Sequence, residues 1–144
     1  MFTTAKDDGL IPYVLTQILD ACVNGITLSD PDLPDNPIVY ANKVFEEMSG
    51  YSQDEIVGRN CRFLQGEDRD QEALATIRAA LANRKACVVT LRNYRKNGEL
   101  FLNRLSIRPL VDREGTVIYY LGVQYDMDHP PGASNEDSDQ VSFA

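Results

Sequence analysis

Residues 58–66 read Gly58-Arg59-Asn60-Cys61-Arg62-Phe63-Leu64-Gln65-Gly66, and the interpretation of the whole chain starts from this stretch. We predict a short helical piece that offers a thiol, a guanidinium and an amide within about one and a half turns. Arg62 and Gln65 are three residues apart and share one helix face, and Cys61 and Leu64 form the adjacent pair. The thiol and an apolar side chain can thus face an interior while Arg62 and Gln65 reach along its edge. Since most cysteines of this kind are small buried hydrophobes, the residues around Cys61 must decide its role.

Upstream of this stretch, the pattern predicts one amphipathic helix and two short strands. Residues 10–22 carry apolar side chains at a spacing of three to four, which is typical of an amphipathic helix. We expect this helix to cap the domain or to pair with another copy of the chain. Strands are predicted at 26–29 and 38–41, separated by a turn-rich loop at 30–37 that contains three prolines.

Downstream, short helical pieces over 42–65 are followed by a helix over 70–83, and this helix is predicted to bury a stripe of Leu74, Ile77 and Leu81. Short connections between the elements favour an α+β fold, an antiparallel sheet with the helices packed on one face. Such a sheet can form the back wall of a ligand pocket. Three further strands are predicted at 86–95, 99–110 and 116–127.

Two asparagines stand in otherwise apolar rows of neighbouring strands. Asn93 shares a strand face with Val89 and Leu91, and Asn103 shares one with Leu105 and Ile107. A polar side chain in such a row needs a hydrogen-bond partner.

The hairpin between these strands tests whether the two asparagines face the same side. The Asn97-Gly98 pair marks the turn. Asn93 and Asn103 share a face only if the loop has an odd number of residues, so we predict a loop of three or five residues with Gly98 in the left-handed conformation.

On the last strand, Gly122 leaves room for a flat ring and Gln124 can reach the edge of that ring.

Length and composition fit one globular domain. The chain has 144 residues, and no apolar stretch approaches the length of about 20 residues needed to cross a bilayer. The first residues lack the pattern of a signal peptide, so the cytoplasm is the expected location. We expect a disordered start and a cap helix over 1–23, the domain over 24–127 and a disordered acidic tail over 128–144.

Charge and residue usage exclude several classes of function. A net charge of −8 argues against nucleic-acid binding, which needs clustered cations. The three cysteines are far apart, which makes a metal site unexpected. The single histidine, His129, stands beside Pro130 and Pro131 and is badly placed as a catalytic base, so we do not expect an enzyme.

Residues 58–66 resemble the signature of the LOV (light-oxygen-voltage) family, the flavin-binding branch of the PAS domains. The resemblance covers about residues 24–127, and separate motifs agree with it in order and spacing. It implies a PAS fold, with a five-stranded antiparallel sheet and helices packed on one face around a flavin pocket. The further motifs are Asp30-Pro31, Leu33-Pro34-Asp35-Asn36-Pro37-Ile38, Asn93-Tyr94-Arg95-Lys96, Phe101-x-Asn103 and Gly122-Val123-Gln124.

The resemblance also implies a mechanism. FMN is held non-covalently in the dark, and after blue light the sulfur of Cys61 adds to flavin ring carbon 4a while ring nitrogen 5 gains a proton. The bond breaks again in the dark, and no thiolate is required beforehand. Gln124 is implied to turn its amide when ring nitrogen 5 becomes a donor, and so to relay the signal to the sheet.

The family pattern assigns residues to each part of the flavin. Arg62 and Arg78 match the pair that holds the phosphate, which favours FMN over riboflavin or FAD. Arg69 is either a third cation for the phosphate or a solvated residue beside Asp68 and Asp70. Asn93 and Asn103 match the pair at the pyrimidine edge. The remaining expected pocket residues are Thr27, Ser29, Asn36, Asn60, Leu64, Gln65, Leu105, Ile107, Tyr120, Gly122 and Gln124.

The output of such a sensor is open at this level. No effector domain is evident after Asp126, and His129-Pro130-Pro131-Gly132 is expected to stop regular structure. We therefore expect a short LOV protein that signals through a homodimer, through the helix at 10–22 or through a separate effector protein. Two alternatives are a redox flavoprotein without photochemistry and a PAS interaction module without a ligand.

Overall fold

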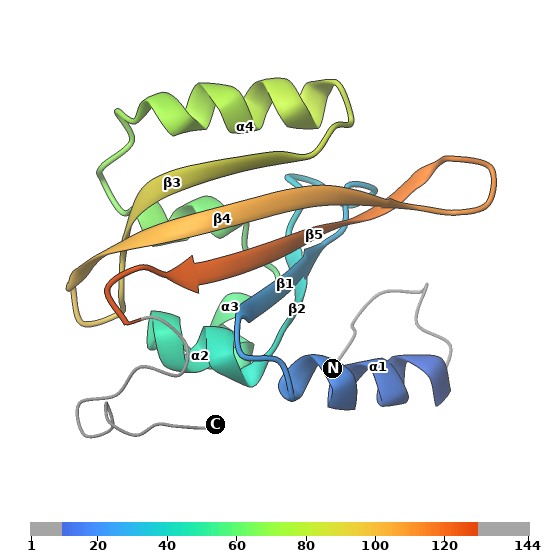
Figure 1. Cartoon of the computed structure of the whole chain (residues 1–144), viewed down its shortest axis with the longest axis horizontal. Coiled ribbons are helices and arrows are strands. Elements are labelled where there is room, and N and C mark those ends of the chain that lie inside the picture. Colours follow the sequence, from blue (N-terminus) through green and yellow to red (C-terminus); the bar gives the residue numbers. More distant parts are fainter. Residues whose placement is uncertain (1–9, 130–144) are drawn as a thin grey trace, which may run out of the picture.

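The computed structural model describes residues 10–129, in which five antiparallel strands form one sheet in the order β2-β1-β5-β4-β3 (Figure 1). The predicted α+β class and its five-stranded antiparallel sheet are confirmed. The elements are α1 (Leu10–Asp20), β1 (Gly25–Ser29), β2 (Ile38–Ala41), α2 (Lys43–Ser49), α3 (Gln53–Ile56), the 3-10 helix η1 (Cys61–Gln65), α4 (Glu72–Ala82), β3 (Cys87–Tyr94), β4 (Leu100–Val111) and β5 (Val117–Asp126).

The hairpin between β3 and β4 has the predicted odd loop. Five residues separate the paired Tyr94 and Leu100, and the Gly98 N–H donates to the Arg95 carbonyl at 2.8 Å. Gly98 has a φ of 92°, the left-handed conformation that glycine adopts without steric cost. The register therefore brings Asn93 and Asn103 to the same face, and both side chains are buried.

The two faces of the sheet carry different clusters. Alternate residues of β5 from Tyr120 to Asp126 are buried on the inner face, where α4 packs. The opposite face carries Leu28 of β1, which packs with Tyr40 and with Leu19 of α1. The helix α1 is thus the exception to the prediction that all helices share one face.

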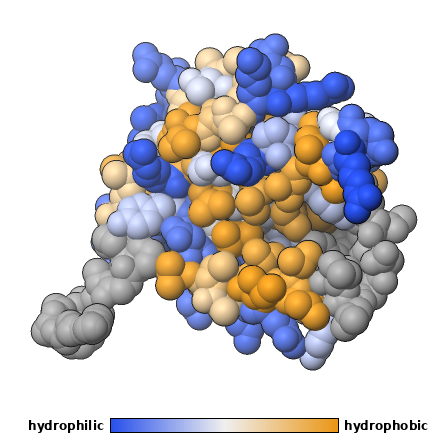
Figure 2. All heavy atoms as spheres, turned by 45° about the vertical axis from the view of Figure 1, so that its right-hand side comes forward, coloured by the Kyte–Doolittle hydropathy of each residue, from blue (hydrophilic) through white to orange (hydrophobic). Residues whose placement is uncertain are grey.

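The helix α1 is fixed at its C-terminal end and leaves several of its apolar side chains exposed. Asp20 accepts a hydrogen bond from the Tyr40 hydroxyl at 3.1 Å, and Leu19 packs against the sheet. The prediction that this helix covers its own domain is therefore only partly correct, because Tyr13 and Ile18 are 59% and 55% exposed. Figure 2 shows apolar side chains gathered on one face of the molecule.

The apolar stripe of α4 differs from its prediction. Leu74, Ile77 and Leu81 pack against the inner face of the sheet, but each is half-buried rather than buried. They border a cavity between α4 and the sheet, and this explains the accessible surface that they keep.

The described chain leaves the domain through a turn after β5. The Asp126 carboxylate accepts the backbone N–H groups of Asp128 and His129 at 3.0 and 3.2 Å, and it pairs with Arg95 at 2.9 Å. The first two residues of the predicted disordered tail are thus ordered. The rest of that tail and residues 1–9 lie outside the described residues.

Residues 10–129 contain neither a candidate membrane span nor a candidate metal site. None of the helices there has the length and apolar character that a bilayer crossing requires. Nor do the described residues bring together three or more metal-binding side chains of His, Cys, Asp or Glu.

Candidate functional site

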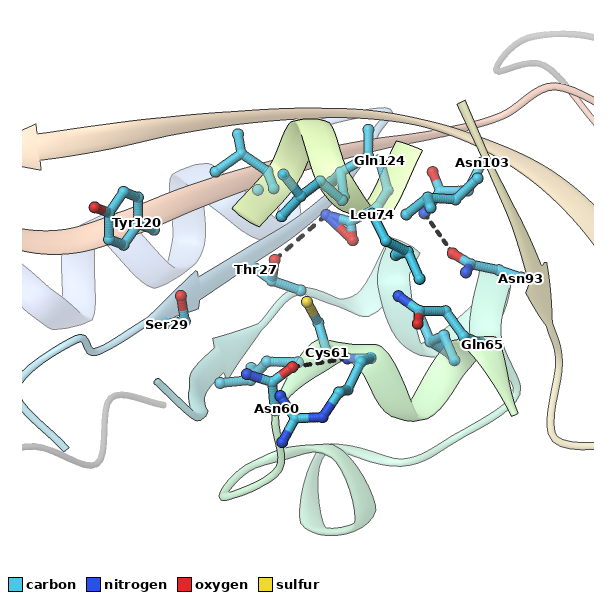
Figure 3. A pocket seen from close by; sticks show the side chains of 18 of the residues that line it. Thr27, Ser29, Asn60, Cys61, Gln65, Leu74, Asn93, Asn103, Tyr120 and Gln124 are labelled. Carbon is cyan, nitrogen blue, oxygen red and sulfur yellow. Dashed lines mark hydrogen bonds between the residues drawn. The ribbon is translucent and has the colours of Figure 1, made fainter. Parts of the chain in front are cut away.

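The inner face of the sheet, η1 and α4 enclose a cavity of about 300 Å³. This volume lies at the lower end of the range for small-molecule sites, roughly 300–1,000 Å³. Figure 3 shows side chains from both ends of the sequence pointing into this space. Every site residue predicted from the sequence lines it: Thr27, Ser29, Asn36, Asn60, Cys61, Arg62, Leu64, Gln65, Arg69, Arg78, Asn93, Asn103, Leu105, Ile107, Tyr120, Gly122 and Gln124.

The Cys61 thiol points into the cavity, toward Thr27 of β1 (Figure 3). Cys61 has accessible surface because it borders the cavity, not because its side chain is turned away from the domain. Desolvation raises the pKa of the Cys61 thiol, and the nearby Arg62 guanidinium opposes this effect only in part. The thiol is therefore protonated at neutral pH.

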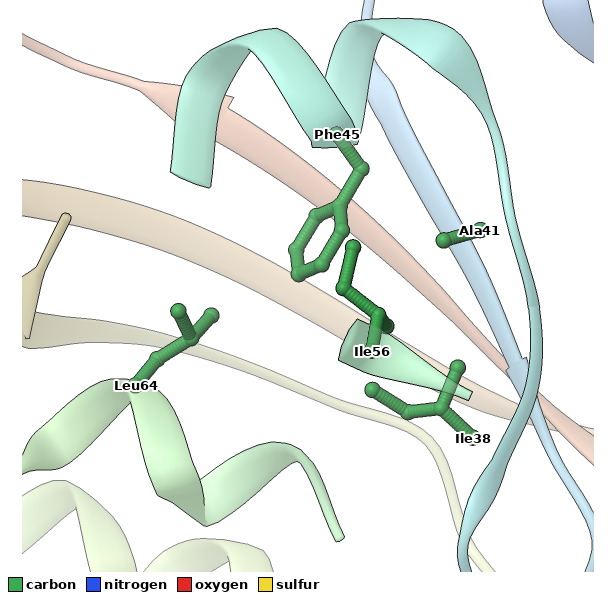
Figure 4. Packing of buried hydrophobic residues seen from close by; sticks show 5 residues of the cluster. All are labelled: Ile38, Ala41, Phe45, Ile56 and Leu64. Atoms are coloured by element: carbon green, nitrogen blue, oxygen red, sulfur yellow. The ribbon is translucent and has the colours of Figure 1, made fainter. Parts of the chain in front are cut away.

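The packing and capping of η1 hold Cys61 in this position. Leu64 anchors the helix in a buried cluster that also contains Ile38 and Phe45 (Figure 4). Asn60 caps the helix because its Oδ1 accepts the Arg62 N–H at 3.0 Å. Cys61 and Leu64 are three residues apart and therefore lie on the same side of this 3-10 helix. The buried Leu64 thus brings Cys61 to the cavity.

Two buried acceptors in the cavity lack a partner among the described residues. The Asn103 amide donates to Asn93 Oδ1 at 2.9 Å, which leaves Asn103 Oδ1 without a partner. Asn36 Oδ1, in the loop between β1 and β2, also has no partner among these residues. Since buried polar atoms are normally satisfied, the cavity is suited to a ligand that carries hydrogen-bond donors at two separate points.

The Gln124 amide lies at the centre of the sheet wall. Its Nε2 donates to the Thr27 hydroxyl at 3.3 Å (Figure 3). A hydroxyl can either accept or donate, so Thr27 can bind the Gln124 amide in either orientation. Gly122 lies between them, and a Cβ atom there would be 2.6 Å from Thr27 Oγ1 and 3.1 Å from Gln124 Nε2.

Gly122→Ala is expected to lower the free energy of unfolding by about 1–3 kcal/mol, because the new methyl group overlaps Thr27. Thr27→Ala removes the overlapping hydroxyl and should relieve part of this loss. Urea denaturation of both single variants and of the double variant measures the coupling, which we expect to be about 1 kcal/mol. Strict additivity of the two substitutions would contradict the close approach seen at Gly122.

Three arginines, Arg62, Arg69 and Arg78, are among the residues that line the cavity. The Arg62 guanidinium pairs with the Asp35 carboxylate, and Arg69 Nε donates to the Gly66 carbonyl at 2.8 Å. Their guanidinium groups suit an anionic group on the ligand.

Of the two acidic neighbours of Arg69 in sequence, Asp68 is tied to other residues. Its carboxylate accepts from Arg92 at 2.6 and 2.8 Å and from the Tyr94 hydroxyl at 2.7 Å. These bonds, with Arg92 the larger cause, lower the pKa of Asp68 to about 2. Asp68 thus holds the loop before α4 against β3 while Arg69 borders the cavity.

Sequence reasoning did not assign five apolar residues to the pocket. Leu74, Ile77 and Leu81 were recognised as a helix stripe, and their period gives no sign that the stripe faces a cavity instead of a packed core. The further lining residues are Ile38, Leu74, Ile77, Leu81 and Leu91. Together with the polar groups, they suit a flat ligand that has an apolar body, a polar edge and an anionic end.

Comparisons with known proteins agree with this description. The model of the PAS domain family matches residues 23–129. A blue-light photoreceptor of Listeria innocua is 40% identical over 79% of the chain, and the match spans 45% of that protein. A blue-light-activated histidine kinase of Erythrobacter litoralis is 46% identical over 71% of the chain and is covered over 28% of its length. The chain thus spans less than half of the length of these relatives.

Solved structures of light-oxygen-voltage proteins resemble the model closely. A domain from a study of flavin analogues and light-oxygen-voltage mechanism is 44% identical, with a TM-score of 0.75; the match covers 83% of this chain and 88% of that one. An RNA-binding light-oxygen-voltage receptor is 39% identical, with a TM-score of 0.76, over 86% of this chain and 35% of that receptor. The expectation of no nucleic-acid binding, which rested on net charge alone, was therefore too firm.

Relatives named for blue-light sensing are thus similar to this chain over most of its length. The family model matches most of the chain, and the solved light-oxygen-voltage structures share its fold at 39% and 44% sequence identity. The chain belongs to the LOV branch of the PAS domain family.

Proposed function

We propose that this chain is a blue-light photoreceptor that binds FMN in the cavity and uses Cys61 as its light-reactive residue. The position of the Cys61 sulfur carries this proposal, because the thiol points into a cavity that suits a flat ligand. The similarity to blue-light photoreceptors and to light-oxygen-voltage structures supports it.

The lining residues fit the parts of FMN. Asn103 Oδ1, a buried acceptor without a protein partner, suits the ring N–H of the pyrimidine edge, with Asn93 beside it. Asn36 Oδ1 suits a hydroxyl of the ribityl chain. Arg62 and Arg78, with Arg69 as a third cation, would hold the phosphate, which favours FMN over riboflavin.

When bound, the flavin supplies absorption of blue light and a ring carbon that forms a reversible bond with a thiol sulfur. Cys61 keeps its proton at neutral pH because burial raises its pKa. The same residue therefore brings both the sulfur and a proton to the cavity, and no separate base is needed. Leu64 and Asn60 hold the thiol in place through the packing and the cap of η1.

Gln124 is proposed as the relay from the cavity to the sheet. Its amide has a donor end and an acceptor end, and the donor end is bound to the Thr27 hydroxyl. A change from acceptor to donor beside Gln124 would favour the opposite orientation of the amide. The Thr27 hydroxyl can adjust to this new orientation, because it can donate a hydrogen bond instead of accepting one. Since Thr27 lies in β1 and Gln124 in β5, the exchange of donor and acceptor would affect the contact between these paired strands.

Gln124→Leu is expected to leave the bleaching of the flavin band intact but to reduce the structural response, by at least roughly half, since leucine has no amide to turn. Hydrogen exchange of the β1 and β5 amides, measured in the dark and under blue light, reports this response. Thr27→Val, which removes only the partner hydroxyl, should give a smaller reduction. An undiminished light-dark difference in Gln124→Leu would exclude Gln124 as the relay.

The helix α1 is proposed as the surface that passes the signal to a second copy of the chain or to a separate effector protein. Its exposed apolar residues include Val14, Leu15 and Ile18, and its end is bonded to the domain through Asp20. Exposed apolar side chains that gather on one surface favour protein contacts. Sedimentation of the full chain in the dark and under blue light distinguishes a homodimer from a monomer that needs an effector.

The absorption spectrum of the purified chain before and after blue light tests the proposed function. Reversible bleaching of a flavin band is the expected result. A flavin band that is stable under light but lost on chemical reduction would instead support a redox flavoprotein. A colourless protein that takes up no added flavin would support a ligand-free interaction module.

A further inference from the structure

Asp35 forms an ion pair with Arg62, one of the arginines that line the cavity. Their side chains are 57% and 47% exposed, so the pair is accessible to water. Asn60 joins the two chain segments, since its Nδ2 donates to the Asp35 carbonyl at 2.7 Å while its Oδ1 accepts the Arg62 N–H at 3.0 Å. The carboxylate of Asp35 is therefore held next to an arginine that lines the cavity.

Within residues 10–129, Asp35 is the carboxylate that forms an ion pair with an arginine of the cavity. Arg69 is bonded to the Gly66 carbonyl, and Asp68 is occupied by Arg92 and Tyr94. Arg78 also lines the cavity. An anionic ligand group that binds Arg62 therefore competes with the Asp35 carboxylate for the guanidinium. A neutral ligand group does not compete with this negative charge.

We infer that Asp35 is a specificity-determining residue, which lowers the preference of the cavity for a phosphorylated flavin over a neutral one. A phosphate must take Arg62 away from Asp35 and then remain close to the carboxylate, whereas riboflavin does neither. Since an exposed ion pair contributes little stability, Arg62 can leave Asp35 at small cost, and the repulsion between carboxylate and phosphate is the larger effect. This inference rests on the proposed function, flavin binding in the cavity.

Asp35→Asn separates the charge of this residue from its other properties. Asp35 has a φ of 68°, a left-handed conformation that asparagine adopts as readily as aspartate. The asparagine oxygen can still accept a hydrogen bond from Arg62, so the loop and the arginine keep their positions. Only the negative charge is lost.

The test equilibrates the full chain, in wild-type and Asp35→Asn forms, with an equimolar mixture of FMN and riboflavin. The bound flavins are then released and separated by chromatography. We expect the bound ratio of FMN to riboflavin to rise about fivefold to tenfold in Asp35→Asn at low ionic strength, and less at high salt. Glu114→Gln is the matched control, because it removes the same charge from the exposed turn between β4 and β5 and should leave the ratio unchanged.

Each other outcome has a distinct meaning. An unchanged ratio in Asp35→Asn would overturn the inference while the proposed function stands. A lower ratio would also overturn it, and would show that the carboxylate orients Arg62 for the phosphate. A wild-type chain that binds neither flavin would overturn the proposed function itself, a result that the ratio measurement identifies separately.

Discussion

Cys61→Ala is expected to abolish the light-driven bleaching of the flavin band and to leave the band itself in place. The substitution removes the sulfur that points into the cavity and leaves the arginines and asparagines that would hold the ligand unchanged. The side chain becomes smaller, so the ligand is not excluded. Absorption spectra in the dark and under blue light measure the result.

The other two cysteines of the chain provide the matched controls. Cys87 packs at the margin of the cluster below α4, and Cys22 bonds to the Ile18 carbonyl beyond the end of α1; neither lines the cavity. Cys22→Ala and Cys87→Ala should therefore bleach and recover as the wild type does. Persistent reversible bleaching in Cys61→Ala would show that another group performs the photochemistry.

Asn42→Ala is expected to lower the free energy of unfolding by about 3–5 kcal/mol, because Asn42 joins three elements from a buried position. Its Oδ1 accepts the N–H of Ile26 in β1 at 2.8 Å and that of Phe45 in α2 at 3.0 Å. Its Nδ2 donates to the carbonyls of Leu19 and Asn24 at 2.8 and 3.0 Å. Alanine would leave these groups without this partner and would remove the cap of α2.

Urea denaturation at a fixed flavin load measures this loss, since bound ligand adds stability of its own. Asn83→Ala is the control. The Asn83 amide bonds to the Ala79 carbonyl at the exposed end of α4, and its loss should cost less than about 1 kcal/mol. A loss below about 1 kcal/mol in Asn42→Ala would mean that water or neighbouring groups replace its four hydrogen bonds.

The features that follow from local sequence pattern were predictable. The alternation around Asn93 and Asn103 fixed which face each would occupy, and the parity argument required the odd loop that Gly98 closes. Ser52 and Glu55 have the three-residue spacing of a capping box, and the structure forms both of its hydrogen bonds. Each of these features depends on residues that are close in sequence or related by a strand period.

The features that depend on distant contacts were not predictable. Asn42 was predicted only as the first residue of the short helical pieces over 42–65, yet its amide binds carbonyls of residues about 20 positions earlier. The pairing of Asp35 with Arg62 and that of Asp68 with Arg92 each join segments more than 20 residues apart. Hydrophobic periodicity reports which side of an element is apolar, but it does not report which polar groups meet across the fold.

The exposed apolar stripe of α1 is a second feature for which hydrophobic periodicity did not predict the contacts. The period of residues 10–22 predicted an amphipathic helix correctly, although the helix ends at Asp20. It did not reveal that Leu19 packs on the sheet while Tyr13 and Ile18 remain exposed. An apolar stripe indicates that something is to be covered, and the partner that covers it has to be identified by other means.

The carboxylate of Asp126 joins the end of β5 rigidly to the turn that follows it. Gln124 and Asp126 point to the same side of the strand, about 7 Å apart along its axis. Asp126 accepts hydrogen bonds from the turn after β5 and forms an ion pair with Arg95. Arg95 also donates to the Met48 carbonyl at 2.7 Å. A protein fused directly after His129 would therefore follow any tilt of β5, because no flexible linker would separate it from the strand.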